Sequence, residues 1–308
     1  MRVMFWGTPE FAAPALRALG GEGFDVCAVV TRPDKPVGRD RVLTAPPIKQ
    51  IALRESLPVF QPSSPREPDF YELLEVVAPD LSVVVAYGHI LPRQIIDLPR
   101  LGTLNIHASL LPALRGAAPI QAAIRDGLTE TGVTIMRMVP ALDAGPIVLQ
   151  SRTPIADDET YGELASRLSE MGALALIEAL TLMEIGRATE RAQDDALATY
   201  ARKVDRETTR IDWTLDAKEV ANAIQAYDPR PGAWSTHRNA DVKLFGARHM
   251  FEVSGAPGEV LETGDEGLVV GCGIGAVRIC DVQPSGKKRM QAVAWHRGRG
   301  ITVGDSLA

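Results

Sequence analysis

The chain has 308 residues, which corresponds to roughly two domains at about 150 residues each, although a single large domain also fits. Its 45% hydrophobic and 23% charged residues exclude a disordered polymer and a membrane bundle as starting points. The formal net charge of −6 argues against a protein that coats nucleic acid by bulk electrostatics, while it leaves room for local basic patches.

The cysteines and the N-terminus indicate a cytoplasmic protein. Cys27, Cys272 and Cys280 form neither a disulfide framework nor a zinc-ligand cluster, and we interpret them as ordinary core thiols in a reducing compartment. The apolar run at residues 3–6 is far shorter than the core of a signal peptide, and no later run reaches the roughly 18 apolar residues that a bilayer requires. We therefore expect a cytoplasmic chain without membrane contact.

The first half of the chain predicts a Rossmann-like α/β fold, with a mainly parallel open sheet and helices on both faces. It repeats a short apolar run, a Gly or Pro, and a helical period. After the first run, Gly7 permits a turn, Thr8 is a candidate cap and Pro9 suits the first helical position. The run at 83–86 lacks polar alternation, which predicts a central strand. The predicted strands are 1–6, 26–30, 81–86, 104–107 and 133–139.

A long helix and a polar segment follow this region. Apolar residues recur at three- and four-residue steps between 157 and 186, which predicts a helix packed on the sheet. Residues 189–206 are polar and lose this periodicity, so we place the domain connection there. The predicted organisation is a catalytic domain at 1–188, a linker at 189–206 and a second domain at 207–308.

The last third of the chain predicts a small C-terminal β-barrel of the oligonucleotide-binding kind. After a helix at 217–227, short runs are separated by Gly, Pro, Asn and Asp, with no room for crossover helices. The predicted strands are 233–237, 242–245, 258–261, 267–270 and 277–282, with a short helix at 290–296.

The segment 105–112 is the most informative for chemistry. If residues 103–107 form a strand, Asn105 and His107 project from one face, because side chains two apart in a strand share a face. Ligand crevices form at such strand ends in open parallel sheets, and the Pro-punctuated chain that follows offers backbone groups to a flat heterocycle. From the residues alone, a functional site and a structural His beside a turn Asn both stay open.

Asp143 follows the strand predicted at 133–139. Between Pro140 and Gly145, an Asp is by default a turn former. Two adjacent strands that end together would nevertheless bring Asp143 towards His107, and an Asp can hold an imidazole in one tautomer. Together these two residues would supply acid–base chemistry.

Ordered motifs in both halves of the chain resemble the folate-dependent formyltransferases, in particular the members that formylate methionyl-tRNA. They lie at 5–11, 32–39, 84–88, 105–112, 115–121, 130–136, 142–145, 210–213 and 283–288. The similarity covers nearly the whole chain. Motifs in this order are specific, whereas an isolated Ser-Leu-Leu-Pro would not be.

This resemblance implies an enzyme that moves the formyl group of 10-formyltetrahydrofolate to the α-amino group of methionine on initiator tRNA. An α-amine has a pKa of about 7.7 to 8.0, so a useful fraction is neutral and nucleophilic near cytoplasmic pH. Asn105 and His107 are implied to stabilise the negative charge that develops on the formyl oxygen. Asp143 is implied to orient His107 and to help the proton reach the folate nitrogen, with no covalent enzyme intermediate and no metal.

The resemblance also implies where the pterin binds. It places the ring against the backbone of Ser109, Leu110, Leu111 and Pro112, with Ala86, Tyr87 and Gly88 nearby. For Tyr87 the alternative is a core aromatic whose hydroxyl is satisfied. For Arg115, in the adjoining motif, the alternative is a simple surface charge.

Basic residues in two regions are the candidates for RNA contact. Residues 32–49 combine Arg and Lys with several Pro and little periodicity, which we interpret as a long basic loop. The resemblance implies that Arg39 in this loop contacts the acceptor end of the tRNA. Lys287 and Lys288 are implied to meet phosphates of the stem with little base readout. Solvated cationic surface is the alternative for both regions, and we expect the protein to act as a monomer.

Four other functions compete with this one. The same core residues serve relatives that formylate an amino sugar nucleotide or hydrolyse formyl-folate, but these small acceptors require neither a basic loop nor a barrel. A noncatalytic RNA-binding module would use the barrel alone. A dinucleotide oxidoreductase is disfavoured because Gly7 stands alone where Gly-x-Gly-x-x-Gly would follow the first strand.

Overall fold

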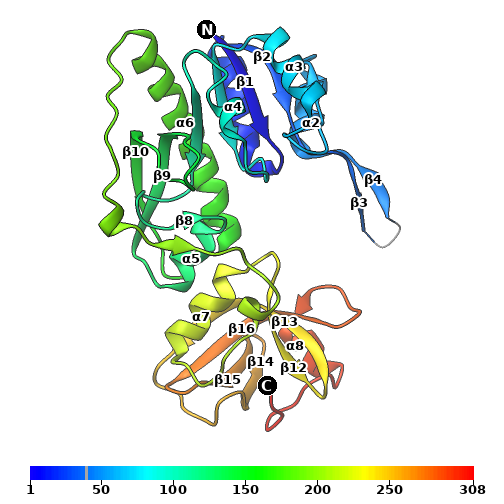
Figure 1. The fold of residues 1–308 in the computed structure, drawn as a ribbon. Coiled ribbons are helices and arrows are strands. Elements are labelled where there is room, and N and C mark those ends of the chain that lie inside the picture. The colour runs from blue at the N-terminus through cyan, green and yellow to red at the C-terminus, as the bar shows by residue number, and fades with distance from the viewer. Residues whose placement is uncertain (39–40) are drawn as a thin grey trace. The chain divides into compact units, whose positions relative to one another are not determined.

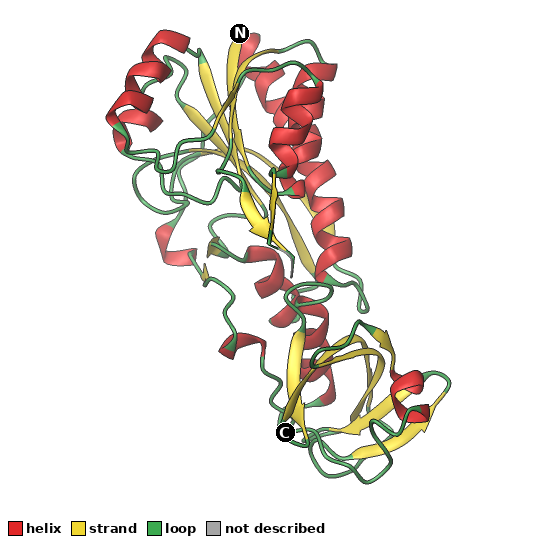
Figure 2. Cartoon of the chain, turned by 90° about the vertical axis from the view of Figure 1, so that its right-hand side faces the viewer, coloured by secondary structure: helices red, strands yellow, loops and turns green. Residues whose placement is uncertain are grey.

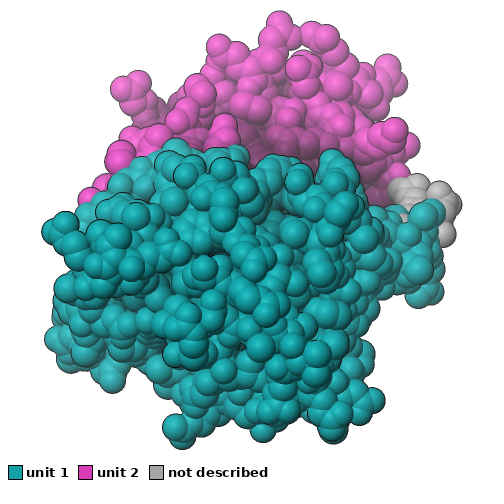
Figure 3. Space-filling view, turned by 90° about the horizontal axis from the view of Figure 1, so that it is seen from above, with its two compact units in different colours: residues 1–116, 132–153, 165–200 teal, residues 117–131, 154–164, 201–308 magenta. Residues whose placement is uncertain are grey.

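The computed structural model describes residues 1–38 and 41–308, which form two compact units. The first unit comprises residues 1–116, 132–153 and 165–200, and the second comprises 117–131, 154–164 and 201–308 (Figure 3). Each unit is therefore assembled from separate stretches of sequence. The domain limits of 1–188 and 207–308 stay a prediction.

The first unit is built on a seven-stranded sheet with the order β10-β9-β7-β6-β1-β2-β5 (Figure 1). Its strands are β1 (Arg2–Gly7), β2 (Asp25–Val30), β5 (Val59–Phe60), β6 (Leu81–Val85), β7 (Thr103–His107), β9 (Glu130–Arg137) and β10 (Ile147–Pro154). Neighbours from β7 to β5 are parallel, whereas β9 runs antiparallel to β7. All residues of β6 are buried between β1 and β7, which confirms its predicted central position.

Helices cover both faces of this sheet, as predicted (Figure 2). On one face, Trp6 and Val84 join a core cluster with residues of α3 (Pro68–Val77) and α4 (Arg93–Ile96). On the opposite face lies the predicted long helix, α6 (Tyr161–Glu184). A Cβ on Gly172 of α6 would lie 2.8 Å from Cγ2 of Ile106, so this glycine lets the helix approach β7 closely. The first unit also contains a 3-10 turn η1 (Glu10–Ala12), α1 (Ala13–Gly21) and α2 (Pro47–Arg54).

Two local predictions for the first unit are wrong. Thr8 does not cap a helix, because its hydroxyl donates to the backbone carbonyl of Tyr87 at 2.9 Å and the chain passes through η1 into α1. Residues 32–49 are not one loop, because β3 (Lys35–Val37) and β4 (Val42–Thr44) pair as an antiparallel hairpin and α2 begins at Pro47. Strands of three residues are too short for alternation to reveal them.

The second unit is an antiparallel β structure with helices, in agreement with the predicted class. Its main sheet has the order β12-β13-β16-β15-β14, and β17 pairs with β16. The strands are β12 (Ala233–His237), β13 (Ala240–Met250), β14 (Val260–Gly264), β15 (Gly267–Gly271), β16 (Ala276–Pro284) and β17 (Met290–Gln291). The helices are α5 (Pro119–Arg125), α7 (Ala217–Ala226) and α8 (Ala292–Arg297), with a 3-10 turn η3 (Glu207–Thr209).

The predicted strands and helix of this unit are confirmed, with shifted ends. Helix α7 begins at a capping box, in which the Asp216 side chain accepts from the Glu219 amide and the Glu219 side chain accepts from the Asp216 amide. All three cysteines are free thiols, but Cys280 is exposed, so its prediction as a core thiol is wrong. Within residues 1–38 and 41–308, none of the helices combines the length and apolar character needed to cross a membrane.

Candidate active site

Strand β7 directs Asn105 and His107 to the same face of the sheet. Ile106 between them faces Gly172 of α6, so its two neighbours point to the opposite face. Asn105 is half-buried, and its carboxamide makes no hydrogen bond to any described residue. The predicted shared face is therefore present, with an amide whose donors are uncommitted within the described chain.

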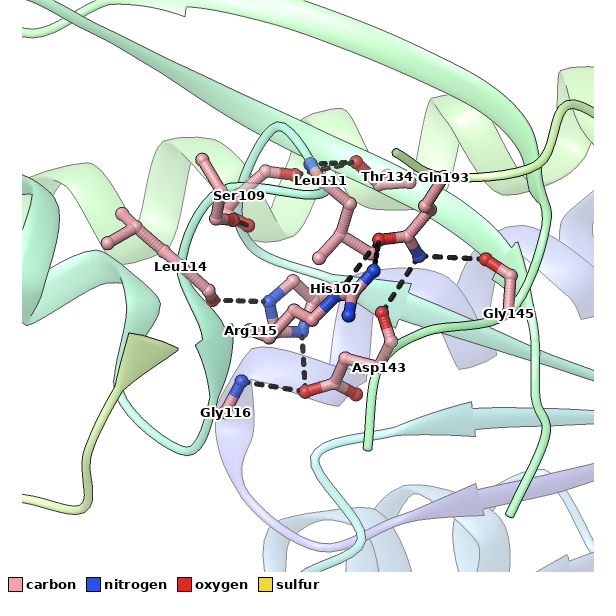
Figure 4. A network of polar contacts seen from close by, with 11 residues as sticks. His107, Ser109, Leu111, Leu114, Arg115, Gly116, Thr134, Asp143, Gly145 and Gln193 are labelled. Carbon is pink, nitrogen blue, oxygen red and sulfur yellow. Dashed lines mark hydrogen bonds and ion pairs between the residues drawn. The ribbon is translucent and has the colours of Figure 1, made fainter. Parts of the chain in front are cut away.

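Both ring nitrogens of the buried His107 face acceptors (Figure 4). Nε2 lies 2.9 Å from the carbonyl oxygen of Leu114. Because a carbonyl only accepts, Nε2 carries a proton and donates it there. Nδ1 lies 3.8 Å from Oδ2 of Asp143, so a proton on Nδ1 would face this carboxylate.

Asp143 lies close to His107, but the reason given by the sequence analysis is wrong. Since β9 is antiparallel to β7, the end of β9 at Arg137 pairs with Leu104, and the two strands do not end together. The chain instead returns through the loop after β9. Asp143 takes a left-handed backbone conformation there (φ 48°), which Asp tolerates better than most residues. Its Oδ2 accepts a hydrogen bond of 2.8 Å from the backbone N–H of Gly116.

Gln193 and Arg115 support this loop, and no local pattern in the sequence indicates either role. The Gln193 amide nitrogen donates to the backbone carbonyls of Asp143 and Gly145, each at 2.8 Å (Figure 4). Its oxygen accepts from Nε and a terminal nitrogen of Arg115, at 3.1 and 2.8 Å. Gln193 lies in the stretch expected to be a linker, where no periodicity signals a long-range contact.

Arg115 is 4% exposed, so its interpretation as a simple surface charge is wrong. Burial by itself lowers the pKa of the guanidinium, but hydrogen bonds to Asp195 and Tyr200 raise it overall. Two short strands pair here, β8 (Arg115–Gly116) and β11 (Tyr200–Ala201). Asp195, which bonds Arg115, lies in the 3-10 turn η2 (Asp195–Leu197). The segment 193–201 therefore contacts the segment that carries Arg115 through hydrogen bonds and strand pairing.

The predicted pterin-binding loop packs beside His107 through Thr134. The Thr134 hydroxyl donates to the carbonyl of Ser109 and accepts from the N–H of Leu111. The Gln150 amide donates to the carbonyl of Leu111. The Ser109 hydroxyl donates to the carbonyl of Ala113. Several backbone groups at 109–112 are thus paired within the protein, and each carbonyl keeps a second lone pair for a ligand.

The segment Ala86, Tyr87 and Gly88 lies at the carboxyl end of β6, at the same edge as the end of β7, because these strands are parallel. Ala86 and Gly88 have positive φ angles of 47° and 89°. The Tyr87 ring is buried and packs edge-to-face on Trp6. Its buried hydroxyl has no hydrogen-bond partner in the described chain, so the alternative of a satisfied core hydroxyl is wrong. Burial raises the pKa of Tyr87 to about 12.

The groups at this edge suit an uncharged heterocycle better than a metal ion. They are a free carboxamide, an imidazole and backbone amides. Among residues 1–38 and 41–308, no group of three or more His, Cys, Asp and Glu side chains is placed to hold a metal.

The candidate RNA-contact residues are spread over both units. Arg39 lies outside the described residues. Lys49 is in α2 rather than in a loop, and it pairs with Asp34 at 2.8 Å. Lys287 and Lys288 are exposed in the turn between β16 and β17.

Family comparisons cover both units of the chain. Residues 1–180 match the family model described as "Formyl transferase", and residues 203–300 match "Formyl transferase, C-terminal domain". The chain is similar to the methionyl-tRNA formyltransferase of Moorella thermoacetica, with 46% identity over 308 residues that cover 100% of this chain and 99% of that protein. The enzyme of the same name from Methylococcus capsulatus is 46% identical over 292 residues, 95% of each chain.

Solved structures share the fold at lower identity. The chain is similar to HypX from Aquifex aeolicus in complex with tetrahydrofolic acid, with a TM-score of 0.66 and 24% identity over 96% of this chain and 46% of HypX. It therefore spans about half the length of that protein. WlaRD, a sugar 3N-formyl transferase, matches with a TM-score of 0.68 and 17% identity over 94% of this chain and 99% of WlaRD.

Proposed function

The chain belongs to the formyl transferase family, and from this membership we propose that it moves a formyl group from 10-formyltetrahydrofolate to the α-amino group of initiator methionyl-tRNA. The product is N-formylmethionyl-tRNA, used in translation initiation. The observation that carries this function is the full-length similarity to methionyl-tRNA formyltransferases, which includes the second unit. The sugar formyl transferase shares only the fold.

Asn105 is proposed to stabilise the negative charge that develops on the formyl oxygen. Its carboxamide is free to donate, whereas the Nε2 proton of His107 is committed to Leu114. Donation from Nε2 to the substrate requires that this bond opens. A preorganised donor of this kind typically contributes ~2.7–4 kcal/mol to the transition state.

His107 and Asp143 are proposed to move the proton. The attacking amine loses a proton as the new C–N bond forms, and the folate nitrogen gains one as the old C–N bond breaks. Asp143 faces Nδ1 at 3.8 Å, a separation beyond hydrogen-bond length. With Nε2 bonded to the Leu114 carbonyl, the imidazole lies between two acceptors, on the strand face that it shares with Asn105.

Substrate contacts extend this proposal to both units. The pterin is proposed to bind against residues 109–112 and 86–88, because both segments lie at the carboxyl edge of parallel strands. Arg39, Lys287 and Lys288 are proposed to contact phosphates of the tRNA. We further propose that the protein is a monomer and that it lies in the cytoplasm. A cytoplasmic location suits both substrates.

The deciding experiment is an assay in which purified protein and 10-formyltetrahydrofolate are mixed with one acceptor at a time. The acceptors are initiator Met-tRNA, elongator Met-tRNA, an amino sugar nucleotide, and water alone. We expect formyl-methionine on initiator tRNA, with the other acceptors far slower. Preferred formylation of the sugar, or release of formate without transfer, would replace the proposed acceptor. Size-exclusion chromatography with light scattering on the same preparation measures the oligomeric state.

A further inference from the structure

The side chain of Gln193 reaches the candidate active site from the segment that precedes β11 (Figure 4). Its nitrogen bonds the backbone oxygens of Asp143 and Gly145 at 2.8 Å each. These two residues flank Ala144 in the loop that carries the carboxylate facing His107. Gln193 therefore binds the loop directly at two backbone positions, one on each side of Ala144.

Arg115 fixes which way the Gln193 amide points. The guanidinium can only donate and the two loop carbonyls can only accept, so the amide oxygen faces Arg115 and the nitrogen faces the loop. Arg115 is itself 4% exposed and is held by Asp195 at 2.7 Å. The orientation of Gln193 is thus determined by buried or bonded partners on both sides.

Sheet pairing does not hold Asp143 in place. It lies beyond the end of β9 in a left-handed conformation (φ 48°), and such conformations persist where surrounding contacts enforce them. Its carboxylate accepts from the Gly116 N–H at 2.8 Å, while its carbonyl accepts from Gln193 at the same distance. One bond aims the side chain and the other anchors the backbone.

We propose that Gln193 is a positioning residue for formyl transfer, acting through Asp143. By anchoring the carbonyls of Asp143 and Gly145, it keeps the carboxylate opposite Nδ1 of His107. This inference rests on the proposed function, since it assigns a role in that reaction. Gln193, in a stretch expected to be only a connection, thereby supports the catalytic arrangement.

Two substitutions separate this role from simple support of Arg115. Gln193→Ala removes all the contacts of the amide. Gln193→Glu keeps the volume and an acceptor for Arg115, but it lacks the N–H groups that bind the loop. If Gln193 served only Arg115, Gln193→Glu would behave as the wild type.

The neighbouring Asp194 supplies a matched control. Its side chain accepts from the Ala196 N–H at 3.0 Å to cap η2, and it makes no hydrogen bond or ion pair with the 143–145 loop among the described residues. Asp194→Ala therefore perturbs the same segment without touching Asp143. We expect its kcat to equal that of the wild type.

Steady-state formylation of initiator Met-tRNA is the first measurement. We expect Gln193→Ala and Gln193→Glu to lower kcat by ~10- to 100-fold, because small misplacements of catalytic groups cost rates of this order, with the KM values of both substrates changed by less than about twofold. In the Asp143→Ala background, adding Gln193→Ala should lower kcat by less than about twofold, since the carboxylate that Gln193 positions is absent. A wild-type kcat in Gln193→Glu, or independent losses in the double variant, would overturn the proposal.

The second measurement does not depend on activity. The ring ¹⁵N shifts of His107, identified by loss of its signals in His107→Asn, report the environment of Nδ1. We expect them to change in Gln193→Glu and to stay unchanged in Asp194→Ala. Unchanged shifts in Gln193→Glu would count against positioning. Absence of Met-tRNA formylation by the wild type would instead remove the proposed function, while the NMR comparison would still test the anchoring.

Discussion

Gly145 offers a steric test of how tightly the Asp143 loop is held. A Cβ at this position would lie 1.8 Å from the carbonyl oxygen of Arg137 and 2.8 Å from its carbonyl carbon. Both atoms are backbone of β9, so no side-chain rotation relieves the overlap. Since real Cβ contacts essentially never fall below 3.0 Å, Gly145→Ala must separate the two backbones by 3.0 − 1.8 = 1.2 Å.

A shift of this size should disturb the loop more than the fold. Gly145 is two residues from Asp143, and Gln193 binds the carbonyls of both. A displacement of about 1 Å near a catalytic group can cost ~10²-fold in rate. Overpacking typically destabilises by ~1–3 kcal/mol. We therefore expect Gly145→Ala to lose ~10²-fold in single-turnover formyl transfer while it still unfolds cooperatively.

Gly20→Ala is the matched control. Gly20 lies in α1, and a Cβ there would meet no atom within 4 Å. The substitution should stabilise by about 0.4–1 kcal/mol through the unfolded state and leave the rate unchanged. Single-turnover rates and thermal unfolding of both variants are compared with the wild type. A wild-type rate for Gly145→Ala would refute the claim that the geometry of this loop controls the chemistry.

Three further predictions test the catalytic pair, the RNA contact and the helix behind β7. Asn105→Ala and His107→Ala should each lower single-turnover transfer by ~10²–10³-fold with tRNA affinity nearly unchanged, and full activity in both would remove the site. Arg39→Ala should weaken use of Met-tRNA and reduce the salt slope of binding by about one phosphate contact, so an unchanged slope would discard that contact. Gly172→Ala sets a methyl 2.8 Å from Cγ2 of Ile106. This overlap should destabilise the fold by ~1–3 kcal/mol, and a gain of ~1 kcal/mol in helix propensity should offset part of that loss. Thermal unfolding should show recovery with Ile106→Leu, which has no Cγ2.

The architecture could be predicted because its determinants are local. Strands β1, β2 and β6 are dominated by apolar runs, which is the pattern expected of strands that are covered on both faces. The shared face of Asn105 and His107 follows from the period of two in any strand. These features depend on residues within a few positions of one another.

Other features depend on contacts between distant residues and leave no local pattern. The Thr8 hydroxyl has a capping composition, yet its acceptor is the Tyr87 carbonyl, 79 positions away. Gln193 lies 50 positions from Asp143 and 78 from Arg115. A polar side chain in an aperiodic stretch looks the same whether it is solvated or buried against such partners. The local sequence therefore predicts a helix cap at Thr8 and a plain linker around Gln193.

Asp143 shows how a correct pairing can be predicted for the wrong reason. If the two strands were parallel and ended together, the sheet itself would bring Asp143 near His107. A loop of any suitable length could then carry Asp143. With β9 antiparallel, the chain must cross back from the Arg137 end of the strand towards His107. A backbone hydrogen bond of 2.9 Å from Arg137 to Pro146 closes this loop, and within it Asp143 is held by the contacts of Gly116 and Gln193. The Asp143–His107 pair is therefore more sensitive to changes at Gly116 and Gln193 than to substitutions within β9 that preserve its packing.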